Sequence, residues 1–159
     1  MLFVVLQLDD HRYAIEAGQV EEILPLVSVK PIPHAPHGVA GVFNYRGVPV
    51  PVIDLSELTL GRPAQRRLST RMIVVHYGND KGAPRSLALI AEKAMETVRR
   101  EPSEFLPTGV SGDRNGYLGP VVTDSRGLLQ RVEIQKLLPP AVRDALFQEV
   151  LETHEPRRA

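Results

Sequence analysis

The stretch GVFNYRGVPVPVIDL, residues 41 to 55, alternates like a strand, turns at Arg46-Gly47 and then resumes its alternation. Its second arm carries Pro49 and Pro51, two positions apart. Alternate residues of a strand direct their N–H groups to the same neighbour, so these prolines remove donors from one side only. We therefore predict a hairpin whose second strand pairs with the first and turns a donor-poor side to a sheet edge, a bulge or a rim.

Short apolar segments with β-type composition flank this hairpin on both sides, separated by turn signals roughly every ten residues. Residues 97–107 are predicted to be irregular, and tight turns are predicted at 78–82 and 111–117. Further strands or extended segments are predicted at residues 2–8, 13–15, 26–32, 72–77, 86–91, 118–123 and 128–132.

Three places favour short helices instead. In residues 16–24, Val20, Ile23 and Leu24 follow helical spacing, which predicts an amphipathic helix that ends at Pro25. Asp54 is a suitable N-cap for one helical turn, and the segment after Glu133 is predicted to be helical on either side of a proline break. With so little helix and no βαβ alternation, the chain is predicted to be all-β, a sandwich or a pair of barrels.

The overall composition fits a globular chain of 159 residues with no net charge and no cysteine. The missing cysteines exclude disulfides, thiolate catalysis and cysteine-based metal sites, and the neutral balance gives no general attraction to polyanions. The start MLFVVLQLDD lacks the basic region and cleavage site of a signal peptide. These features favour protein partners or small ligands.

Motifs for catalysis and cofactor binding are missing from the sequence. Neither Gly-rich phosphate loop nor the GxSxG elbow occurs, so we expect no enzyme, no catalytic residue and no cofactor. His34 and His37 are three residues apart but have no nearby carboxylate, which favours ordinary loop histidines over a metal site.

The polar connector at residues 60–71 suggests a boundary between two halves. Its four arginines leave one alternative open, a small β-barrel that binds nucleic acid or a phosphorylated ligand: Arg62, Arg66, Arg67 and Arg71.

The hairpin residues Gly41-Val42, Asn44, Arg46-Gly47, Pro51-Val52 and Asp54-Leu55 resemble a pattern of the CheW-like chemotaxis coupling family. Upstream, Val20, Glu22 and Ile23 resemble the family's V-x-E-[IV] element. Downstream, SLALIAEKAMETV is similar to a strand of the second half, with Ala91-Glu92 where the family has Val-Asp. That departure suggests a divergent member, a second coupling protein in a chemotaxis or surface-sensing pathway.

The resemblance implies two five-stranded SH3-like barrels that share a hydrophobic core, with short helices including a C-terminal one. It implies a CheW-like domain over residues 1–138, with the connector near 60–71, followed by a C-terminal helix and tail over 139–159. Such a protein is a non-catalytic adaptor, which joins the tip of a methyl-accepting chemoreceptor to the regulatory domain of a CheA-like histidine kinase. Its expected place is cytoplasmic, at receptor arrays on the inner face of the membrane.

By matched position, the resemblance also implies two binding surfaces. The receptor-facing groove would use Val20, Glu22, Ile23, Asn44 and Arg46, and the kinase-facing edge would use Gly41, Ser86 and Leu87. Apolar side chains can receive a helix in a groove, while Glu22 and Arg46 can set its register through charged hydrogen bonds. The alternative is that Val20 and Ile23 face the core, that Glu22 is solvated and that Arg46 only occupies a turn.

Overall fold

A computed structural model of the chain describes residues 1–78, 85–109 and 116–154, with residues 95 and 148–154 described by their backbone alone. Most of the two turns predicted at 78–82 and 111–117, and the tail residues 155–159, lie outside the described part. No helix of the described residues is long and apolar enough to cross a membrane.

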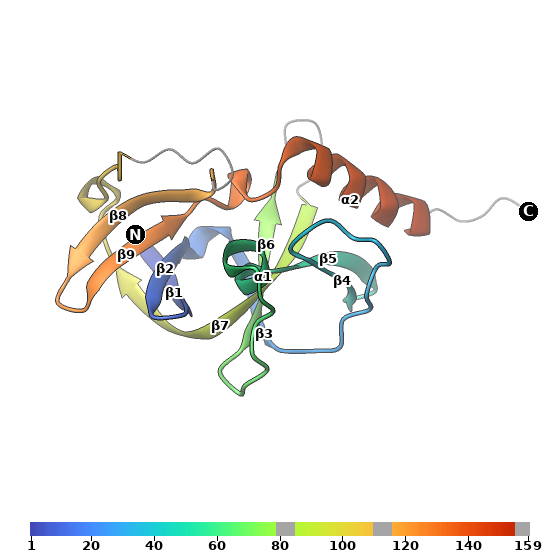
Figure 1. Cartoon of the computed structure of the whole chain (residues 1–159), viewed down its shortest axis with the longest axis horizontal. Coiled ribbons are helices and arrows are strands. Elements are labelled where there is room, and N and C mark those ends of the chain that lie inside the picture. Colours follow the sequence, from blue (N-terminus) through green and yellow to red (C-terminus); the bar gives the residue numbers. More distant parts are fainter. Residues whose placement is uncertain (79–84, 110–115, 155–159) are drawn as a thin grey trace, which may run out of the picture.

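Within the described residues, nine strands form two groups of five, because the long strand β7 (Arg85–Arg99) belongs to both (Figure 1). Sheet A combines the C-terminal part of β7 with β1 (Leu2–Leu8), β2 (His11–Glu16), β8 (Leu118–Asp124) and β9 (Gly127–Val132). Sheet B combines its N-terminal part with β3 (Val20–Pro25), β4 (Val39–Tyr45), β5 (Val48–Asp54) and β6 (Arg71–Tyr77).

Strand β7 passes from one sheet to the other near Glu92. Its residues up to Ala91 pair with β6, whereas Glu92 and the residues beyond it pair with β1. Lys93, directly after this junction, has a positive φ of 51°. The strand predicted at 86–91 therefore continues to Arg99, and the irregular segment predicted from Thr97 is wrong for its first residues, because β1 offers them a pairing partner.

Three apolar clusters support the predicted architecture of two β units with a shared core. One lies inside sheet B and includes Phe43 and Val74. Another lies inside sheet A and includes Phe3 and Leu129. The largest combines residues of both sheets, which means that neither sheet buries its second apolar face alone. The all-β fold with a few short helices is confirmed.

The proline-bearing hairpin forms as predicted, but its second strand does not end the sheet, because its last residues pair with β7. Strands β4 and β5 pair in register from Tyr45–Val48 inward, which leaves Arg46-Gly47 as a two-residue turn. Strand β5 pairs with β7 only from Val52 onward, which is directly after the second proline. Pro49 and Pro51 have no backbone N–H to donate to a second neighbour. The pairing with β7 therefore begins with the residues that follow them, which have this donor.

Residues 16–24 do not form the predicted helix, which is a correction. Ala17–Gln19 make a single 3-10 turn (η1), and Val20–Pro25 form strand β3 against β6. A helix of nine residues is marginal in water. Pairing with β6 satisfies the backbone of the segment and gives an alternation of half-buried and exposed side chains along β3. Tertiary pairing therefore outweighs the local helical spacing.

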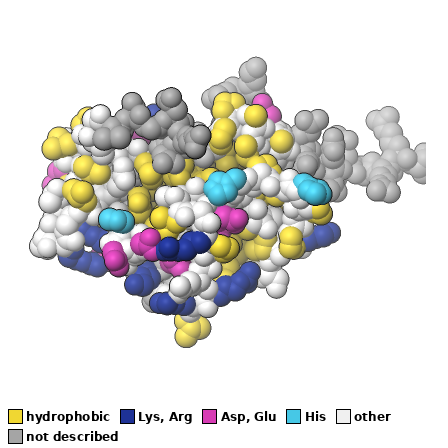
Figure 2. Space-filling model, viewed as in Figure 1, with side chains coloured by type: hydrophobic (Ala, Val, Ile, Leu, Met, Phe, Trp, Pro, Cys, Tyr) yellow, Lys and Arg dark blue, Asp and Glu magenta, His cyan; other side chains and the backbone are white. Residues whose placement is uncertain are grey.

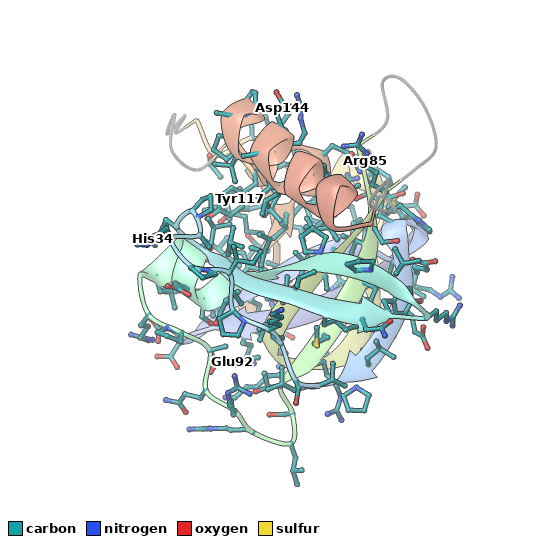
Figure 3. All side chains as sticks on the ribbon, turned by 90° about the vertical axis from the view of Figure 1, so that its right-hand side faces the viewer. His34, Arg85, Glu92, Tyr117 and Asp144 are labelled. Carbon is teal, nitrogen blue, oxygen red and sulfur yellow. The ribbon has the colours of Figure 1, made fainter. Side chains whose placement is uncertain are left out.

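The helices α1 and α2 pack against the shared core. Asp54 caps α1 (Leu55–Leu60), as predicted, since its Oδ1 accepts hydrogen bonds from the N–H groups of Ser56 (3.0 Å) and Glu57 (3.2 Å). After a 3-10 turn at Ile134–Lys136 (η3), α2 (Pro140–His154) crosses the shared core, with Tyr117 below it and Arg85 beside it (Figure 3). Phe147 of α2 stacks on Tyr77, with ring centroids 5.7 Å apart.

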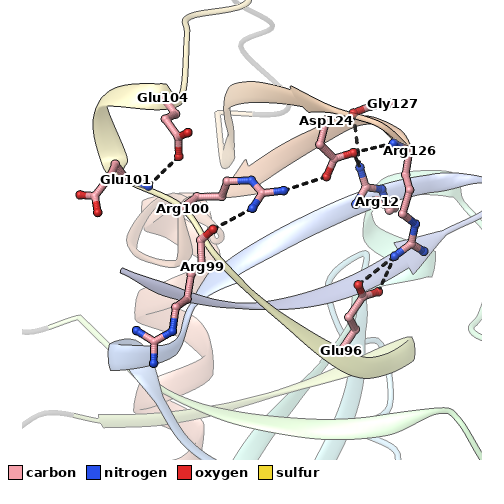
Figure 4. Close-up of polar contacts among 9 residues, drawn as sticks. All are labelled: Arg12, Glu96, Arg99, Arg100, Glu101, Glu104, Asp124, Arg126 and Gly127. Carbon is pink, nitrogen blue, oxygen red and sulfur yellow. Dashed lines mark hydrogen bonds and ion pairs between the residues drawn. The ribbon is translucent and has the colours of Figure 1, made fainter.

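A polar cluster holds the β8–β9 hairpin to the rest of sheet A (Figure 4). The carboxylate of Asp124 receives hydrogen bonds from Arg12 at 2.5 Å and from Arg100 at 3.1 Å. Arg12 is only 6% exposed, so the Asp124 carboxylate offsets the cost of burying its guanidinium charge. At the turn of the same hairpin, Arg126 contacts both carboxylate oxygens of Glu96. These contacts link β2, β7 and the β8–β9 hairpin, and their role is structural.

Candidate functional site

The tip of the β4–β5 hairpin and strand β3 meet through three side chains. The Tyr45 hydroxyl donates to Glu22 Oε2 at 2.6 Å, and Arg46 Nη2 donates to the same oxygen at 2.9 Å. The Arg46 guanidinium also lies over the Tyr45 ring, 5.1 Å from its centroid. We call Glu22, Tyr45 and Arg46 the hairpin clasp. It joins the two strands at which sheet B would otherwise stay open, since β3 and β4 are not paired with each other.

The hairpin turn holds Arg46 in a conformation that glycine or asparagine would adopt more easily. Its φ is 52° and that of Gly47 is 84°, the two positive values that a tight hairpin turn of this class requires. The Asn44 side chain stabilises the turn by accepting a hydrogen bond from the Gly47 N–H at 2.7 Å. A non-glycine residue at positive φ costs about 1 kcal/mol, and the contacts of Arg46 with Glu22 and Tyr45 act against this cost.

The contact with Glu22 also keeps the Tyr45 hydroxyl protonated. The hydrogen bond to Glu22 raises the pKa of Tyr45 to about 12, with smaller contributions from burial and from the nearby Glu21. The phenol therefore stays a donor at neutral pH. Arg46 is 70% exposed and Glu22 33% exposed. The clasp therefore presents the charged pair of Glu22 and Arg46 at the surface, above the buried ring of Tyr45.

The other two predicted receptor-binding residues lie on the opposite side of β3. Val20 packs against the shared core, and Ile23 pairs with the buried Ile73 of β6 while remaining 40% exposed. Because successive side chains of a strand alternate, Glu22 and Ile23 point to opposite faces. The structure thus divides the predicted set between the hairpin clasp with Asn44 and an apolar pair at the rim of the shared core.

An open groove of ≈ 480 Å³ runs beside the hairpin, and Asn44 is the predicted receptor residue in its wall. Val42 and Pro49 contribute apolar residues to the hairpin wall, and the extended segment at Ser28–Lys30 forms the opposite wall. This segment is attached to β4 by mutual backbone hydrogen bonds between Lys30 and Val42 of 2.8 and 2.9 Å. The groove therefore lies between β4 and residues 28–30, while Glu22 and Arg46 lie outside its lining.

The three residues predicted for the kinase-facing edge differ in what they expose. Ser86 is partly exposed and donates to Glu21 Oε2 at 3.1 Å. Leu87 has no exposed surface and belongs to the shared core, so its side chain is unavailable for a direct contact. Gly41 is buried with a φ of 146°, and a Cβ built there would lie 2.0 Å from the Lys30 carbonyl oxygen. Gly41 and Leu87 therefore shape the backbone and the core.

The arginine-rich connector joins α1 to β6, and both strands that flank it, β5 and β6, belong to sheet B. Figure 2 shows Lys and Arg side chains along the lower edge of the molecule, with acidic side chains just above them. Two of the four connector arginines have partners: Arg62 pairs with Asp9, and Arg71 donates to the Leu68 carbonyl. Both contacts give the connector a structural role, and the Arg62–Asp9 pair offsets one of its positive charges.

The histidines of the proline-rich loop do not converge with acidic side chains. His34 and His37 are exposed, and Figure 3 shows His34 at the outside of its loop. In the described ranges, no group of three or more His, Cys, Asp or Glu residues is placed to hold a metal ion.

Tyr45 is the residue of this region that sequence reasoning missed. Its position directly before the arginine of the corner was the available signal, but its role depends on Glu22, which is 23 residues away in the sequence. Only the pairing of β3 with β6 brings that carboxylate to the hairpin tip.

Comparisons with known proteins agree over most of the chain. The family model described as "CheW-like domain" matches residues 2–141. The protein "Chemotaxis protein CheW" of Treponema pallidum is 42% identical over 140 residues, which cover 84% of this chain and 79% of that protein. The protein of the same name from Klebsiella aerogenes is 30% identical over 158 residues, 96% of this chain and 89% of that one. The crystal structure of scaffolding protein TtCheW from Thermoanaerobacter tengcongensis shares the fold, with a TM-score of 0.76 at 20% identity over 87% of each chain.

Proposed function

Because the chain belongs to the CheW-like domain family, we propose that it is a chemotaxis coupling adaptor that links a chemoreceptor to a CheA-like histidine kinase without catalysing a reaction. The observation that carries this proposal is the family match over residues 2–141. The relatives named above are chemotaxis proteins, and none of the comparisons supports the nucleic-acid alternative.

The finer assignments belong to the same proposal. The receptor's cytoplasmic tip would contact the hairpin clasp and the apolar rim at Val20 and Ile23, with Asn44 stabilising the turn. The kinase regulatory domain would contact the edge near Ser86, which Gly41 and Leu87 shape from within. The coupling domain would occupy residues 1–138, ahead of the C-terminal helix and tail over 139–159. The adaptor would act in the cytoplasm at receptor arrays.

The hairpin clasp supports a role in recognition because its geometry is fixed before a partner arrives. Glu22 Oε2 already accepts two hydrogen bonds, so its carboxylate is held in one orientation. Arg46 uses Nη2 for this contact, and its exposed guanidinium has further donors for a partner's carboxylate or carbonyl groups. Preorganised side chains lose less conformational entropy on binding, which favours specific recognition.

Binding of the full-length protein to two purified partners tests the proposal. The kinase regulatory domain and a receptor tip fragment should form a ternary complex with the adaptor, detected by size-exclusion chromatography. The variant Arg46→Glu should weaken receptor binding by about tenfold or more while kinase binding persists, because a charge reversal places two carboxylates side by side.

Arg126→Glu is the matched control for this variant. Arg126 is also an exposed arginine in a two-residue hairpin turn and is also paired with a glutamate, but in sheet A. It should leave receptor binding unchanged. Equal losses in both variants, or receptor binding unaffected by Arg46→Glu, would contradict the assignment of the receptor surface.

A further inference from the structure

Among the residues of the hairpin clasp, Tyr45 has a distinctive environment. Its ring packs inside sheet B beside Phe43, with centroids 5.9 Å apart, and the residue is 8% exposed. Its hydroxyl nevertheless reaches the rim and donates to Glu22 Oε2 at 2.6 Å. The side chain therefore connects the interior of sheet B to a carboxylate at the surface.

We infer that Tyr45 is a positioning residue of the receptor-binding surface, which holds Glu22 and Arg46 in the arrangement that a receptor helix recognises. The inference rests on the proposed function, because it concerns the same surface. It adds a residue that acts through its neighbours and has little exposed area of its own.

Two contacts give Tyr45 control over the charged pair. The phenol fixes Glu22 Oε2 from the interior, so the oxygen that Arg46 also binds cannot rotate away without losing a short hydrogen bond. The Tyr45 ring supports the guanidinium from below at 5.1 Å. Arg46 and Glu22 are long side chains that would otherwise sample several rotamers in water, and exposed ion pairs alone hold such side chains poorly.

The hydroxyl also remains available as a donor under ordinary conditions. The hydrogen bond to Glu22 raises the pKa of Tyr45 to about 12, so the phenol is protonated at any pH at which the protein would work. Phenylalanine at this position would keep the ring beneath Arg46 but would leave Glu22 with a single partner. The hydroxyl and the ring can thus be tested separately.

Tyr45→Phe should weaken binding of the receptor tip fragment to the full-length adaptor by about tenfold, the lower end of the loss expected for one hydrogen bond to a charged group. Binding of the kinase regulatory domain should stay unchanged. In a Glu22→Ala background the same substitution should have no further effect, because the hydroxyl has lost its acceptor. This non-additivity is a result that a general loss of stability would not produce.

Tyr117→Phe is the control for a buried phenol. Tyr117 is 3% exposed, and its hydroxyl shares a hydrogen bond of 2.9 Å with Thr59 in the shared core, away from the clasp. This variant should reduce stability and leave receptor binding as it is. Wild-type receptor affinity for Tyr45→Phe, additive effects with Glu22→Ala, or an equal loss of kinase binding would each overturn the inference alone. If the wild-type adaptor does not bind the receptor fragment, the proposed function fails and this inference fails with it.

Discussion

Gly41 allows a sharp test of whether a residue matched to the kinase-facing edge acts through contact or through the fold. Its Cα approaches the backbone of Lys30 so closely that an added Cβ would lie 2.0 Å from the carbonyl oxygen and 2.8 Å from the carbonyl carbon. The neighbouring atoms are backbone, so no side chain can rotate to make room. Gly41→Ala must therefore separate the segment around Lys30 from β4.

The size of the effect follows from what the separation breaks. Lys30 and Val42 exchange two backbone hydrogen bonds, each contributing about 1 kcal/mol to stability. The φ of 146° at Gly41 adds a conformational cost for alanine of at least about 1 kcal/mol. We expect Gly41→Ala to reduce the free energy of unfolding by about 3 kcal/mol.

Urea unfolding followed by circular dichroism measures this change, with Gly47→Ala as the matched control. Gly47 also has a positive φ, 84°, but a Cβ there meets no atom within 4 Å, so the substitution should cost only about 1 kcal/mol. Equal stability of the two variants would refute the reasoning from close approach. Loss of kinase binding by a fully stable Gly41→Ala protein would instead support a direct contact at this residue.

Two further predictions concern the core and the polar cluster of sheet A. Leu87→Ala should lower the free energy of unfolding by about 2–5 kcal/mol, because it leaves a cavity at a fully buried position. Urea unfolding measures this loss. A loss below about 1 kcal/mol would place Leu87 outside the core. The hydrogen bond from Arg12 lowers the pKa of Asp124 against the opposing effect of burial. The ionised carboxylate therefore stabilises the fold fully at pH values above the ordinary aspartate pKa near 4. This contribution is lost as the pH falls through the pKa of Asp124 in the folded state. Asp124→Asn should lower the free energy of unfolding by about 3 kcal/mol at pH 7, because Arg12 loses its partner ion. The variant should also lose less of this free energy than the wild type as the pH falls from 7 to 2. An equal decrease with pH in the two proteins would contradict this role.

Local patterns predicted the elements whose signals lie within a few residues. The arginine-glycine corner, the two prolines and the Asp54 cap each produce their structure through neighbouring backbone atoms, and each forms as expected. The β8–β9 hairpin across its two-residue turn is of the same kind. The family resemblance added the double architecture and the shared core, which spacing alone left open between a sandwich and barrels.

The candidate site could be predicted only in part. Its charged members Glu22 and Arg46 were named from the motif, and the structure brings them to 2.9 Å. Their grouping with Val20 and Ile23 came from matched positions in the family pattern. In the observed strand Glu22 and Ile23 alternate, and a register shift between Val20 and Glu22 puts Val20 on the side of Ile23, so the set separates onto two faces.

The amino-acid sequence by itself determined where this chain turns, where a strand loses its donors and which family the hairpin resembles. Only the tertiary structure decided that residues 20–25 become a strand, that β7 serves two sheets and that Tyr45 meets Glu22. The physical reason is the separation in sequence of the interacting groups. Turns and caps depend on atoms that are close in sequence, whereas a strand forms only when a partner strand from elsewhere in the chain exchanges hydrogen bonds with it. The free edge of β6 provided that partner for β3, and the hairpin clasp formed as a consequence.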